Sequence, residues 1–348
     1  MVRTPDHEFP LTRFTTNRSI GEAESIQRQR LEDARWIHAR HAADFVERPC
    51  CCCDSTRTTA VEPFDGRYGV HRCDRCRTLF VNPVPNPAAL ADYYNHAACN
   101  LALADLMRRR YRRGVDHILD DRVATVLAYA RASTVPVLRI LELGCNSGAF
   151  LARLEYFLAR DLPGRPVELI GCDLDRNAIE TAVEPSLHLI CGDAAELVRR
   201  EVRQFDLILH YEVIEHLADP SAVMRDLHRL LAPGGRMVFT TPNALGLEMV
   251  ASPYNSYRLL AHAIFPPMHL NAFTTQSLPH FVLRAGFDLV ALDTPGRLDV
   301  DMVTECADHV TEPGFRALAR LDERARGLVQ HLIASLGASS HVRCVVTR

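Results

Sequence analysis

Two pairs of cysteines carry the most specific chemical pattern in this chain of 348 residues. Cys50, Cys53, Cys73 and Cys76 follow the spacing C-x2-C-x19-C-x2-C, which lies in the range of protein zinc sites. Thiolates separated by two residues can reach one tetrahedral ion at about 2.3 Å. The stretch 49–85 has almost no apolar core of its own. We therefore expect a structural Zn²⁺ ion to hold this stretch together.

The neighbouring Cys51 and Cys52 leave open, on spacing alone, which of the first four cysteines bind the ion. The chain has twelve cysteines, and residues 1–10 carry Asp6 and Glu8 in place of an apolar signal segment. No run approaches the roughly 18 apolar residues that span a bilayer. We therefore expect a cytoplasmic protein without a membrane partner, whose cysteines are thiols or metal ligands and not disulfides.

A glycine loop supplies a second chemical pattern. The segment 141–148 (LELGCNSG) follows an apolar run and opens a helix. Gly144 and Gly148 tolerate the positive φ of a tight turn, and Asn146 is the next best residue type for it. The helix N-terminus behind the loop offers free N–H groups and the positive end of a dipole. Asp173 ends the next strand, where a carboxylate can accept both hydroxyls of a ribose; a plain strand-to-helix turn without a ligand is the alternative.

A third pattern follows the fourth expected strand. Glu212, Glu215 and His216 lie at its carboxyl end, where ligands bind in parallel sheets. One histidine with two carboxylates suits a hard divalent cation such as Mg²⁺. His216 and His269 are also candidate catalytic bases, which would take a proton from a bound hydroxyl or amine. The alternatives are that Glu215 and His216 cap a helix and shape the pocket floor, and that His269 is a loop histidine bonded to backbone.

The elements that position these residues alternate from residue 137 onward. Strands alternating with helices predict an α/β fold with a parallel, doubly wound sheet. A seventh strand at residues 341–347 alternates like a strand at the sheet edge. The other strands are expected at 137–143, 167–172, 187–190, 205–210, 235–240 and 287–292, with helices at 149–159, from 172 to about 183 and around 221–231.

The chain divides into four parts by composition and punctuation. A helical pattern over 18–48 ends at Pro49, which places an N-terminal helical segment at 1–48. The cysteine module follows at 49–85. A helical connector occupies 86–131, and Asn86-Pro87 suits its helix start. Residues 132–348 form the α/β domain, with a helical insertion at about 293–340.

Taken in order, these motifs resemble those of class I S-adenosylmethionine-dependent methyltransferases, which have a Rossmann-like sheet of seven strands. The matching segments are 142–148, Asp173, Asp193 with Ala194, 205–217, 231–235 and 241–243. The resemblance implies that Asp173 holds the ribose and that Asp193 reads the adenine edge. Asn146 departs from the family, in which glycine is commoner at that position. The cofactor-binding residues that it implies are Glu142, Gly144, Asn146, Gly148, Asp173, Leu174, Asp193, Ala194 and the backbone near His210.

Two narrower resemblances concern the acceptor and the module. The string 212–216 (EVIEH) resembles the ubiquinone-pathway O-methyltransferases, in which it is associated with a divalent cation that orients a catechol-like acceptor. Residues 50–55, 73–83 and the Tyr93-Tyr94 pair resemble methyltransferases with a zinc ribbon, including sugar C-methyltransferases. That likeness favours the outer pair, Cys50 and Cys53, as the first two zinc ligands.

The function expected from these patterns is methyl transfer from S-adenosylmethionine to a small molecule, on oxygen in preference to carbon or nitrogen, with secondary metabolism as one setting. A net charge of −3 gives no general attraction to nucleic acid. The alternatives are an RNA methyltransferase that grips RNA with the module, favoured by the arginine run 108–113, a C- or N-methyltransferase of a nucleotide-linked sugar, and a cofactor-binding protein without turnover. The helix at 18–48 offers a surface for a homodimer.

Overall fold

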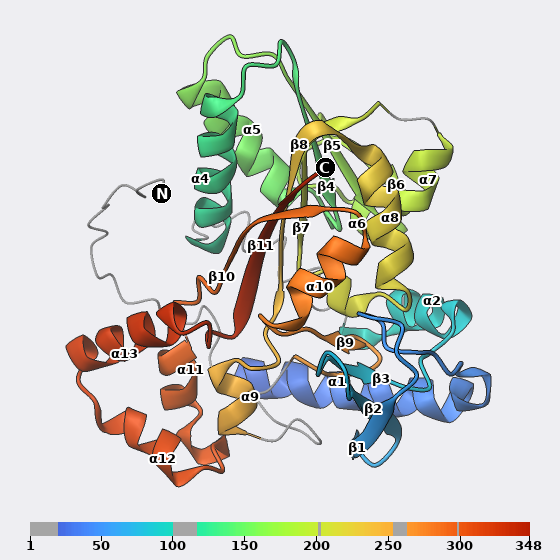
Figure 1. Cartoon of the computed structure of the whole chain (residues 1–348), viewed down its shortest axis with the longest axis vertical. Helices are drawn as coiled ribbons and strands as arrows, with labels where there is room; N and C mark the ends of the chain where they lie inside the picture. The colour runs from blue at the N-terminus through green and yellow to red at the C-terminus, as the bar shows by residue number, and fades with distance from the viewer. Residues whose placement is uncertain (1–19, 100–116, 201–202, 253–262, 298) are drawn as a thin grey trace.

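The computed structural model describes residues 20–99, 117–200, 203–252, 263–297 and 299–348 (Figure 1). A seven-stranded sheet in the order β10-β11-β8-β7-β4-β5-β6 forms its centre. The five strands from β8 to β6 run parallel, whereas β11 is antiparallel to both of its neighbours. The strands are β4 (Leu138–Leu143), β5 (Val167–Asp173), β6 (His188–Cys191), β7 (Phe205–Tyr211), β8 (Leu231–Pro242), β10 (Asp288–Asp293) and β11 (His341–Thr347).

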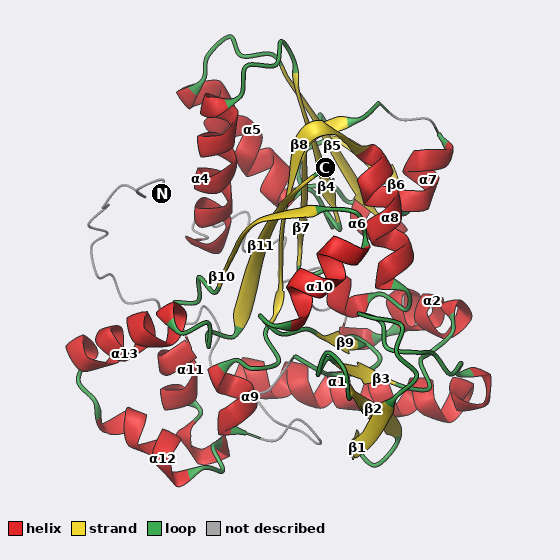
Figure 2. Ribbon diagram, viewed as in Figure 1, coloured by secondary structure: helices red, strands yellow, loops and turns green. Residues whose placement is uncertain are grey.

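Helices cover both faces of this sheet (Figure 2). The helices α4 (His117–Ala132) and α5 (Ala149–Asp161) pack on one face, with the short α6 (Arg176–Glu180) beside them. The helices α7 (Ala194–Arg199), α8 (Pro220–Leu230) and α10 (Ser277–Arg284) pack on the other. The central strands are therefore apolar on both sides, as in other covered parallel sheets. The predicted α/β fold class is confirmed.

The position of the last strand differs from the prediction. Strand β11 lies between β8 and β10, and β10 is the edge strand. The side chains of β11 alternate as expected, with Val342, Cys344 and Val346 fully buried. Alternation reports that one face of a strand is buried more deeply than the other, and it carries no information on whether one or both edges are paired. The placement at the edge was therefore wrong.

The cysteine module forms a second, smaller sheet. Its strands β1 (Thr58–Phe64), β2 (Tyr68–Cys73) and β3 (Leu79–Val81) are antiparallel. The fourth strand of this sheet, β9 (Asn271–Ala272), comes from the α/β domain and pairs with β3. The module therefore does not end at its own sequence boundary, because a segment about 190 residues further on completes its sheet.

The N-terminal helix is shorter than its pattern predicts. Helix α1 spans Ile20–His41 and is followed by a 3₁₀ turn, η1 (Ala42–Asp44). Pro49 is not its end point, since Val46 already pairs with Val84 of the module, with N–O distances of 2.9 and 2.8 Å. The connector begins with α2 (Pro87–His96), where Asn86 Oδ1 accepts the cap hydrogen bond from Ala89 at 2.8 Å. The arginine run of the connector lies outside the described residues.

The insertion near the C-terminus consists of α11 (Asp299–Glu305), α12 (Pro313–Arg316) and α13 (Glu323–Ser335), with 3₁₀ turns η3 (Ala307–His309) and η4 (Ala317–Arg320). These elements share an apolar cluster with α9 (Leu247–Ala251), which follows β8. Figure 1 shows the insertion and the cysteine module at the same end of the sheet, where the parallel strands terminate. Among the described residues, no helix has the length and apolar character that crossing a membrane requires.

Candidate functional site

The glycine loop between β4 and α5 has the backbone that its sequence predicts. Gly144, Asn146 and Gly148 have φ values of 76°, 49° and 79°. A Cβ atom at Gly144 would lie 2.5 Å from the side chain of Val213, so this position has no room for a side chain. Asn146 accepts a hydrogen bond from the N–H of Ser147 at 2.8 Å through its own side chain. Asparagine therefore maintains here the left-handed turn for which glycine is commoner.

Asp173, at the end of β5, is tied to this loop. Its carboxylate accepts hydrogen bonds from the N–H of Asn146 at 2.7 Å and from that of Asp175 at 2.8 Å. Burial raises the pKa of Asp173, although these N–H groups favour the charged form. Each carboxylate oxygen keeps a second lone pair. The arrangement fits a group that offers two adjacent hydroxyls, such as a ribose.

Glu142 in β4 adds a buried acid behind the loop. The carboxyl is 5% exposed, and Oε2 has no hydrogen-bond partner among the described residues. The pKa of Glu142 is raised to about 8, chiefly by burial; the positive charge of Arg122 opposes this effect and the negative charge of Asp173 adds to it. An unpartnered buried acid is costly unless a ligand satisfies it. A cationic ammonium group, such as the one on the methionine part of S-adenosylmethionine, fits this position.

The remaining residues implied by the resemblance surround the same strand ends. Asp193 caps α7 by accepting a hydrogen bond from the N–H of Glu196 at 2.7 Å. Ala194 is buried beside it, whereas the side chain of Leu174 is 64% exposed. These positions follow the carboxyl ends of β5 and β6.

His210 in β7 has a buried side chain. Its ring stacks on Phe239 with the centroids 4.5 Å apart, and neither ring nitrogen has a partner among the described residues. Burial lowers the pKa of His210 to about 3. Since the imidazole is enclosed in the core, only the backbone of His210 remains to face a cofactor.

A group of side chains that we call the histidine cluster lies beyond these loops. It consists of Glu215, His216, His269 and Tyr94. The ligand atoms of the first three lie within 4.8 Å of one another, and the rings of His216 and His269 meet edge to face with centroids 4.8 Å apart. The hydroxyl of Tyr94 lies 3.2 Å from His216 Nδ1. The cluster joins three distant segments: η2 (Ile214–His216), the loop before β9, and α2.

Burial keeps Glu215 and His216 uncharged near neutral pH. Glu215 is fully buried, and burial followed by the negative charge of Glu212 raises its pKa well above the ordinary value. Thr241 donates a hydrogen bond to Glu215 at 3.0 Å. Burial lowers the pKa of His216 to about 4, although Glu212 opposes this effect. At neutral pH His216 is therefore a neutral imidazole that can accept a proton.

Glu212 belongs to a different set of contacts from the one expected. Its backbone has φ 59°, and its carboxylate accepts a hydrogen bond from Thr240 at 2.5 Å and lies 3.3 Å from Nε2 of His341. At this site, among the described residues, the side chains close enough together to bind one metal ion are those of Glu215, His216 and His269. Glu212 is not one of them. The left-handed turn at Glu212 directs its side chain toward β11. Two imidazoles with one carboxylate do not fit Mg²⁺, which prefers oxygen ligands and retains waters.

The cysteines of the module converge on one point. The sulfur atoms of Cys50 and Cys76, and those of Cys53 and Cys73, are each 3.5 Å apart, and all four lie within 4.8 Å of one another. Tetrahedral ligands at the zinc–sulfur distance lie about 3.8 Å from each other. All four are buried thiols. Cys52 lies outside this group, and its sulfur donates to the carbonyl of Ser277 at 3.4 Å.

The two Cys-x-x-Cys turns have the same local geometry. In each, the residue after the second cysteine has a positive φ, 53° at Asp54 and 66° at Arg77. The N–H of that residue donates to the carbonyl of the first cysteine, at 2.9 and 3.0 Å respectively. This repeated turn directs both thiols of a pair toward one side. It fits the outer pair, Cys50 and Cys53, better than Cys51 and Cys52.

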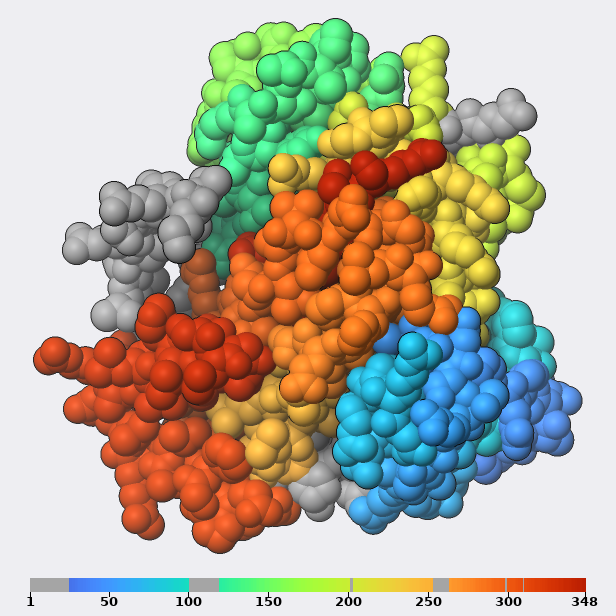
Figure 3. Space-filling model, in the orientation of Figure 1, coloured from blue at the N-terminus to red at the C-terminus, as the bar shows by residue number. Residues whose placement is uncertain are grey.

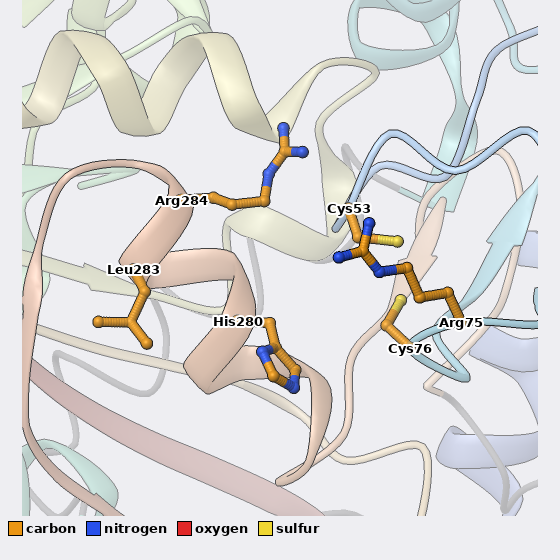
Figure 4. A pocket seen from close by; sticks show the side chains of 6 residues that line it. All are labelled: Cys53, Arg75, Cys76, His280, Leu283 and Arg284. Atoms are coloured by element: carbon orange, nitrogen blue, oxygen red, sulfur yellow. The ribbon is translucent and has the colours of Figure 1, made fainter.

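A pocket of about 450 Å³ opens beside the cysteines. Figure 4 shows Arg75 from the turn after β2 and His280 and Arg284 from α10 around the thiols of Cys53 and Cys76. Arg284 forms an ion pair with Asp54. Positive side chains beside four thiolates offset the negative charge that a zinc tetrathiolate carries. Arg75 of the module and Arg284 of α10 are the arginines that line this pocket.

Residues 108–292 match the model of a family described as methyltransferase domain. This match covers more than half of the chain. The chain belongs to this family. Together with the sheet order and the loop at Gly144, the match identifies a class I S-adenosylmethionine-dependent methyltransferase.

Curated relatives of this methyltransferase include ubiquinone biosynthesis O-methyltransferases. The protein of Caulobacter sp. (strain K31) is 31% identical over 125 residues, which are 34% of this chain and 47% of that protein. The protein of Pseudomonas putida (strain W619) is 28% identical over 128 residues, 33% of this chain and 51% of that protein. The chain spans about half the length of the curated relatives it matches.

Two solved methyltransferase structures align with the chain at low sequence identity. A SAM-dependent methyltransferase from Archaeoglobus fulgidus aligns with a TM-score of 0.43 and 15% identity over 70% of this chain and 98% of that one. The plantazolicin methyltransferase BamL aligns with a TM-score of 0.47 and 15% identity, over 74% of this chain and 94% of that one.

Sequence reasoning did not assign roles to three residues near the site of this methyltransferase. Tyr94 was visible only as half of a tyrosine pair, His341 as part of a strand, and Arg48 as the end of a helix pattern. Each contacts the site through the tertiary fold, at Glu212 for His341 and at His216 for Tyr94. No short-range pattern in the sequence marks such contacts.

Proposed function

We propose that this methyltransferase transfers the methyl group of S-adenosylmethionine to a hydroxyl oxygen of a small molecule, with His216 as the general base. The observation that supports this proposal most strongly is the neutral His216, with a side chain that is 23% exposed, beside Tyr94 and His269. Burial and the negative charge of Asp173 raise the pKa of Tyr94, so its hydroxyl keeps its proton at neutral pH. Tyr94 is therefore a member of the histidine cluster that also responds to the acid assigned to the ribose.

The cofactor residues hold the donor in this proposal. Asp173 accepts the ribose hydroxyls, Asp193 and Ala194 border the adenine, and Glu142 and Gly144 lie against the methionine part. When bound, S-adenosylmethionine supplies an electrophilic methyl group and leaves as S-adenosylhomocysteine.

The histidine cluster accepts the proton of the acceptor hydroxyl in this proposal. As the acceptor oxygen forms its bond to the methyl carbon, the carbon–sulfur bond breaks and its electron pair stays with sulfur. The acceptor hydroxyl loses its proton to His216, so that charge balances over donor, acceptor and base. His269 and Tyr94 border the acceptor and orient it, which contributes to the rate by holding the oxygen in line with the methyl group.

The proposal gives a structural role to Zn²⁺ and no role to Mg²⁺. The four cysteines hold a structural Zn²⁺ ion that organises the module. Mg²⁺ has no step, because the histidine cluster lacks the oxygen ligands that it prefers. We therefore expect turnover to be unchanged when Mg²⁺ is added to protein prepared without it.

Methyl-labelled S-adenosylmethionine tests the proposal. The protein is incubated separately with catechols and simple phenols, with nucleotide-linked sugars, and with bulk RNA, and the labelled product is fractionated. The proposal expects label in the phenol fraction for the wild type and a loss of at least about 100-fold in His216→Gln. Label in the sugar fraction on carbon or nitrogen, label confined to RNA, or no label in any fraction would overturn it.

A further inference from the structure

Arg48 connects the cysteine module to both halves of the histidine cluster. Its Nη1 donates to the carbonyl of Ala218 at 2.7 Å, just after the turn that carries His216. Its Nη2 donates to the carbonyl of Leu270 at 3.0 Å, directly after His269. One guanidinium therefore bonds to the two segments that supply the imidazoles.

Arg48 is itself fixed on the module side. Its N–H donates to Asn82 Oδ1 at 2.8 Å, and its Nε donates to the carbonyl of Val81 at 3.2 Å. The guanidinium carbon lies 5.5 Å from the ring centroid of the buried Phe80. Arg48 is thus placed by the β3 strand, whose position depends on the cysteines that precede it in the chain.

Asn271 extends this link into the turn 214–217, which carries His216. Its Oδ1 accepts a hydrogen bond from Arg48 Nη2 at 2.8 Å. Its Nδ2 donates to the carbonyl of Ile214 at 3.0 Å and to that of Leu217 at 2.8 Å, on either side of the residues Glu215 and His216. The side chain is fully buried. One amide therefore bonds to both ends of the turn 214–217 and joins this turn to Arg48.

We propose that Arg48 is a positioning residue that fixes the His216 turn and the His269 loop relative to each other. The inference rests on the proposed function, because it assigns Arg48 a role in the same proton transfer. Arg48 touches neither ring and acts through the backbone carbonyls and Asn271. By this route the folded state of the cysteine module determines the geometry of a base that lies outside the module.

The hydrogen-bond pattern explains why arginine is needed. The guanidinium donates in several directions at once from a planar group, and here it reaches three carbonyls and one amide oxygen. Lysine carries one nitrogen and would keep part of this set. Methionine is shorter and keeps only the aliphatic stem of the side chain, without the guanidinium and its hydrogen bonds. Arg48→Lys and Arg48→Met therefore separate a partial loss of the hydrogen bonds from their complete loss.

Hydrogen exchange followed by mass spectrometry tests the inference without any acceptor. Peptides over 212–219 and 266–273 should exchange about tenfold faster or more in Arg48→Met, whereas a peptide over β7 should be unchanged. Arg48→Lys should restore protection in part. The matched control is Arg67→Met, since the Arg67 side chain bonds to Asp65 within the module. Titration with S-adenosylhomocysteine should give the wild-type affinity for all three variants.

Asn271→Leu tests the same link from the catalytic side and covers the case in which Arg48→Met fails to fold. It should expose the same two peptides, and the double variant should be no worse than the more severe single one, because both remove one connection. On an acceptor that the wild type labels, Arg48→Met should lower kcat about 100-fold with little change in KM.

Unchanged exchange in both peptides for Arg48→Met and for Asn271→Leu would refute the positioning role, whatever the labelling experiment gives. Full additivity of the two substitutions would do the same. Failure of the wild type to label any acceptor would refute the proposed function and leave the exchange result to be read independently.

Discussion

The cofactor loops and the histidine cluster lie at the same end of the sheet but are built differently. The cofactor loops are the turn from Gly144 to Gly148 and the turns after Asp173 and Asp193, and each is formed by residues close together in sequence. The histidine cluster takes Tyr94 from α2, His216 from the end of β7 and His269 from a loop before β9. Figure 3 shows the module packed directly against the segment that contains this loop.

This difference determines which changes each region tolerates. In the cofactor loops, positive φ values and backbone N–H groups hold the acids in place, as at Asn146 and Asp173. In the histidine cluster, side chains from separate elements hold one another, with the module as the far support. Damage to the module should therefore disable proton transfer and leave cofactor binding largely intact, and the following experiments test that separation.

The largest effect is expected from removal of a zinc ligand. Cys73→Ser should abolish stoichiometric zinc, because a structural site needs all four thiolates and its binding free energy is on the order of 10 kcal/mol. Loss of β3 order should then remove its pairing with β9 and with it methyl transfer. Metal analysis of the purified protein and the labelling assay measure the two consequences.

The matched control is Cys52→Ser, which alters a buried cysteine outside the group. It should retain zinc and activity, since a serine hydroxyl can keep the bond to the carbonyl of Ser277. Full zinc content in Cys73→Ser, or loss of zinc in Cys52→Ser, would show that the ligand set is wrong. Loss of S-adenosylhomocysteine affinity by much more than about tenfold in Cys73→Ser would remove the contrast between the two regions.

The second effect concerns the base itself. His216→Gln should lower kcat by about 10²–10⁴-fold, the usual contribution of general base catalysis, with the affinity for S-adenosylhomocysteine unchanged. Because the pKa of His216 is lowered to about 4, the base is already unprotonated at pH 6, and kcat/KM should fall only as the pH drops through about 4. A pH–rate profile of the wild type measures this limb.

His269→Gln serves as the comparison for that experiment. If His269 only orients the acceptor, its loss should lower kcat less than the loss of the base in His216→Gln does. A greater loss of kcat in His269→Gln than in His216→Gln would transfer the role of base to His269. If kcat/KM of the wild type instead fell as the pH dropped through about 6.5, burial would not lower the pKa of His216 as argued.

The sequence predicted the locally built cofactor loops better than the histidine cluster, which distant segments form together. The strands, the loop at Gly144 and the Cys-x-x-Cys pairs depend on neighbouring residues, and their periodicity and turn chemistry were visible. The fourth strand of the module, contributed by Asn271 and Ala272, was not visible, because two residues carry no strand pattern. Nor did spacing show that the positive φ of Glu212 would separate it from Glu215 and pair it with His341. These outcomes depend on long-range contacts.

A smaller effect on free energy is expected from the cofactor acid. Asp173→Ala should weaken S-adenosylhomocysteine binding by about 100-fold or more, since hydrogen bonds to a charged group contribute roughly 1.5–3 kcal/mol each and two ribose hydroxyls lose their acceptor. Calorimetric titration measures it. Asp193→Ala should cost less, about tenfold, because that carboxylate is 48% exposed and already caps α7. Undiminished affinity in Asp173→Ala would refute the assignment of the ribose site.

The smallest effect concerns stability and uses His210, whose side chain is buried in the core. Its folded-state pKa is lowered to about 3 from an ordinary value of 6.5, so the unfolded chain binds a proton at mildly acidic pH and the folded chain does not. The stability associated with the neutral ring is therefore present above pH 6.5 and is lost as the pH falls toward 3. At pH 5 this single group should lower the free energy of unfolding by about 2 kcal/mol relative to pH 8.

His210→Phe removes this titration and keeps a ring to stack on Phe239. Urea unfolding at pH 8 and at pH 5 should show a smaller difference for the variant than for the wild type, by about 2 kcal/mol. The same substitution at the exposed His331 should leave the difference unchanged. An equal pH dependence in His210→Phe and wild type would mean that the ring is hydrated or hydrogen-bonded in solution, and the burial argument for His210 would then fail.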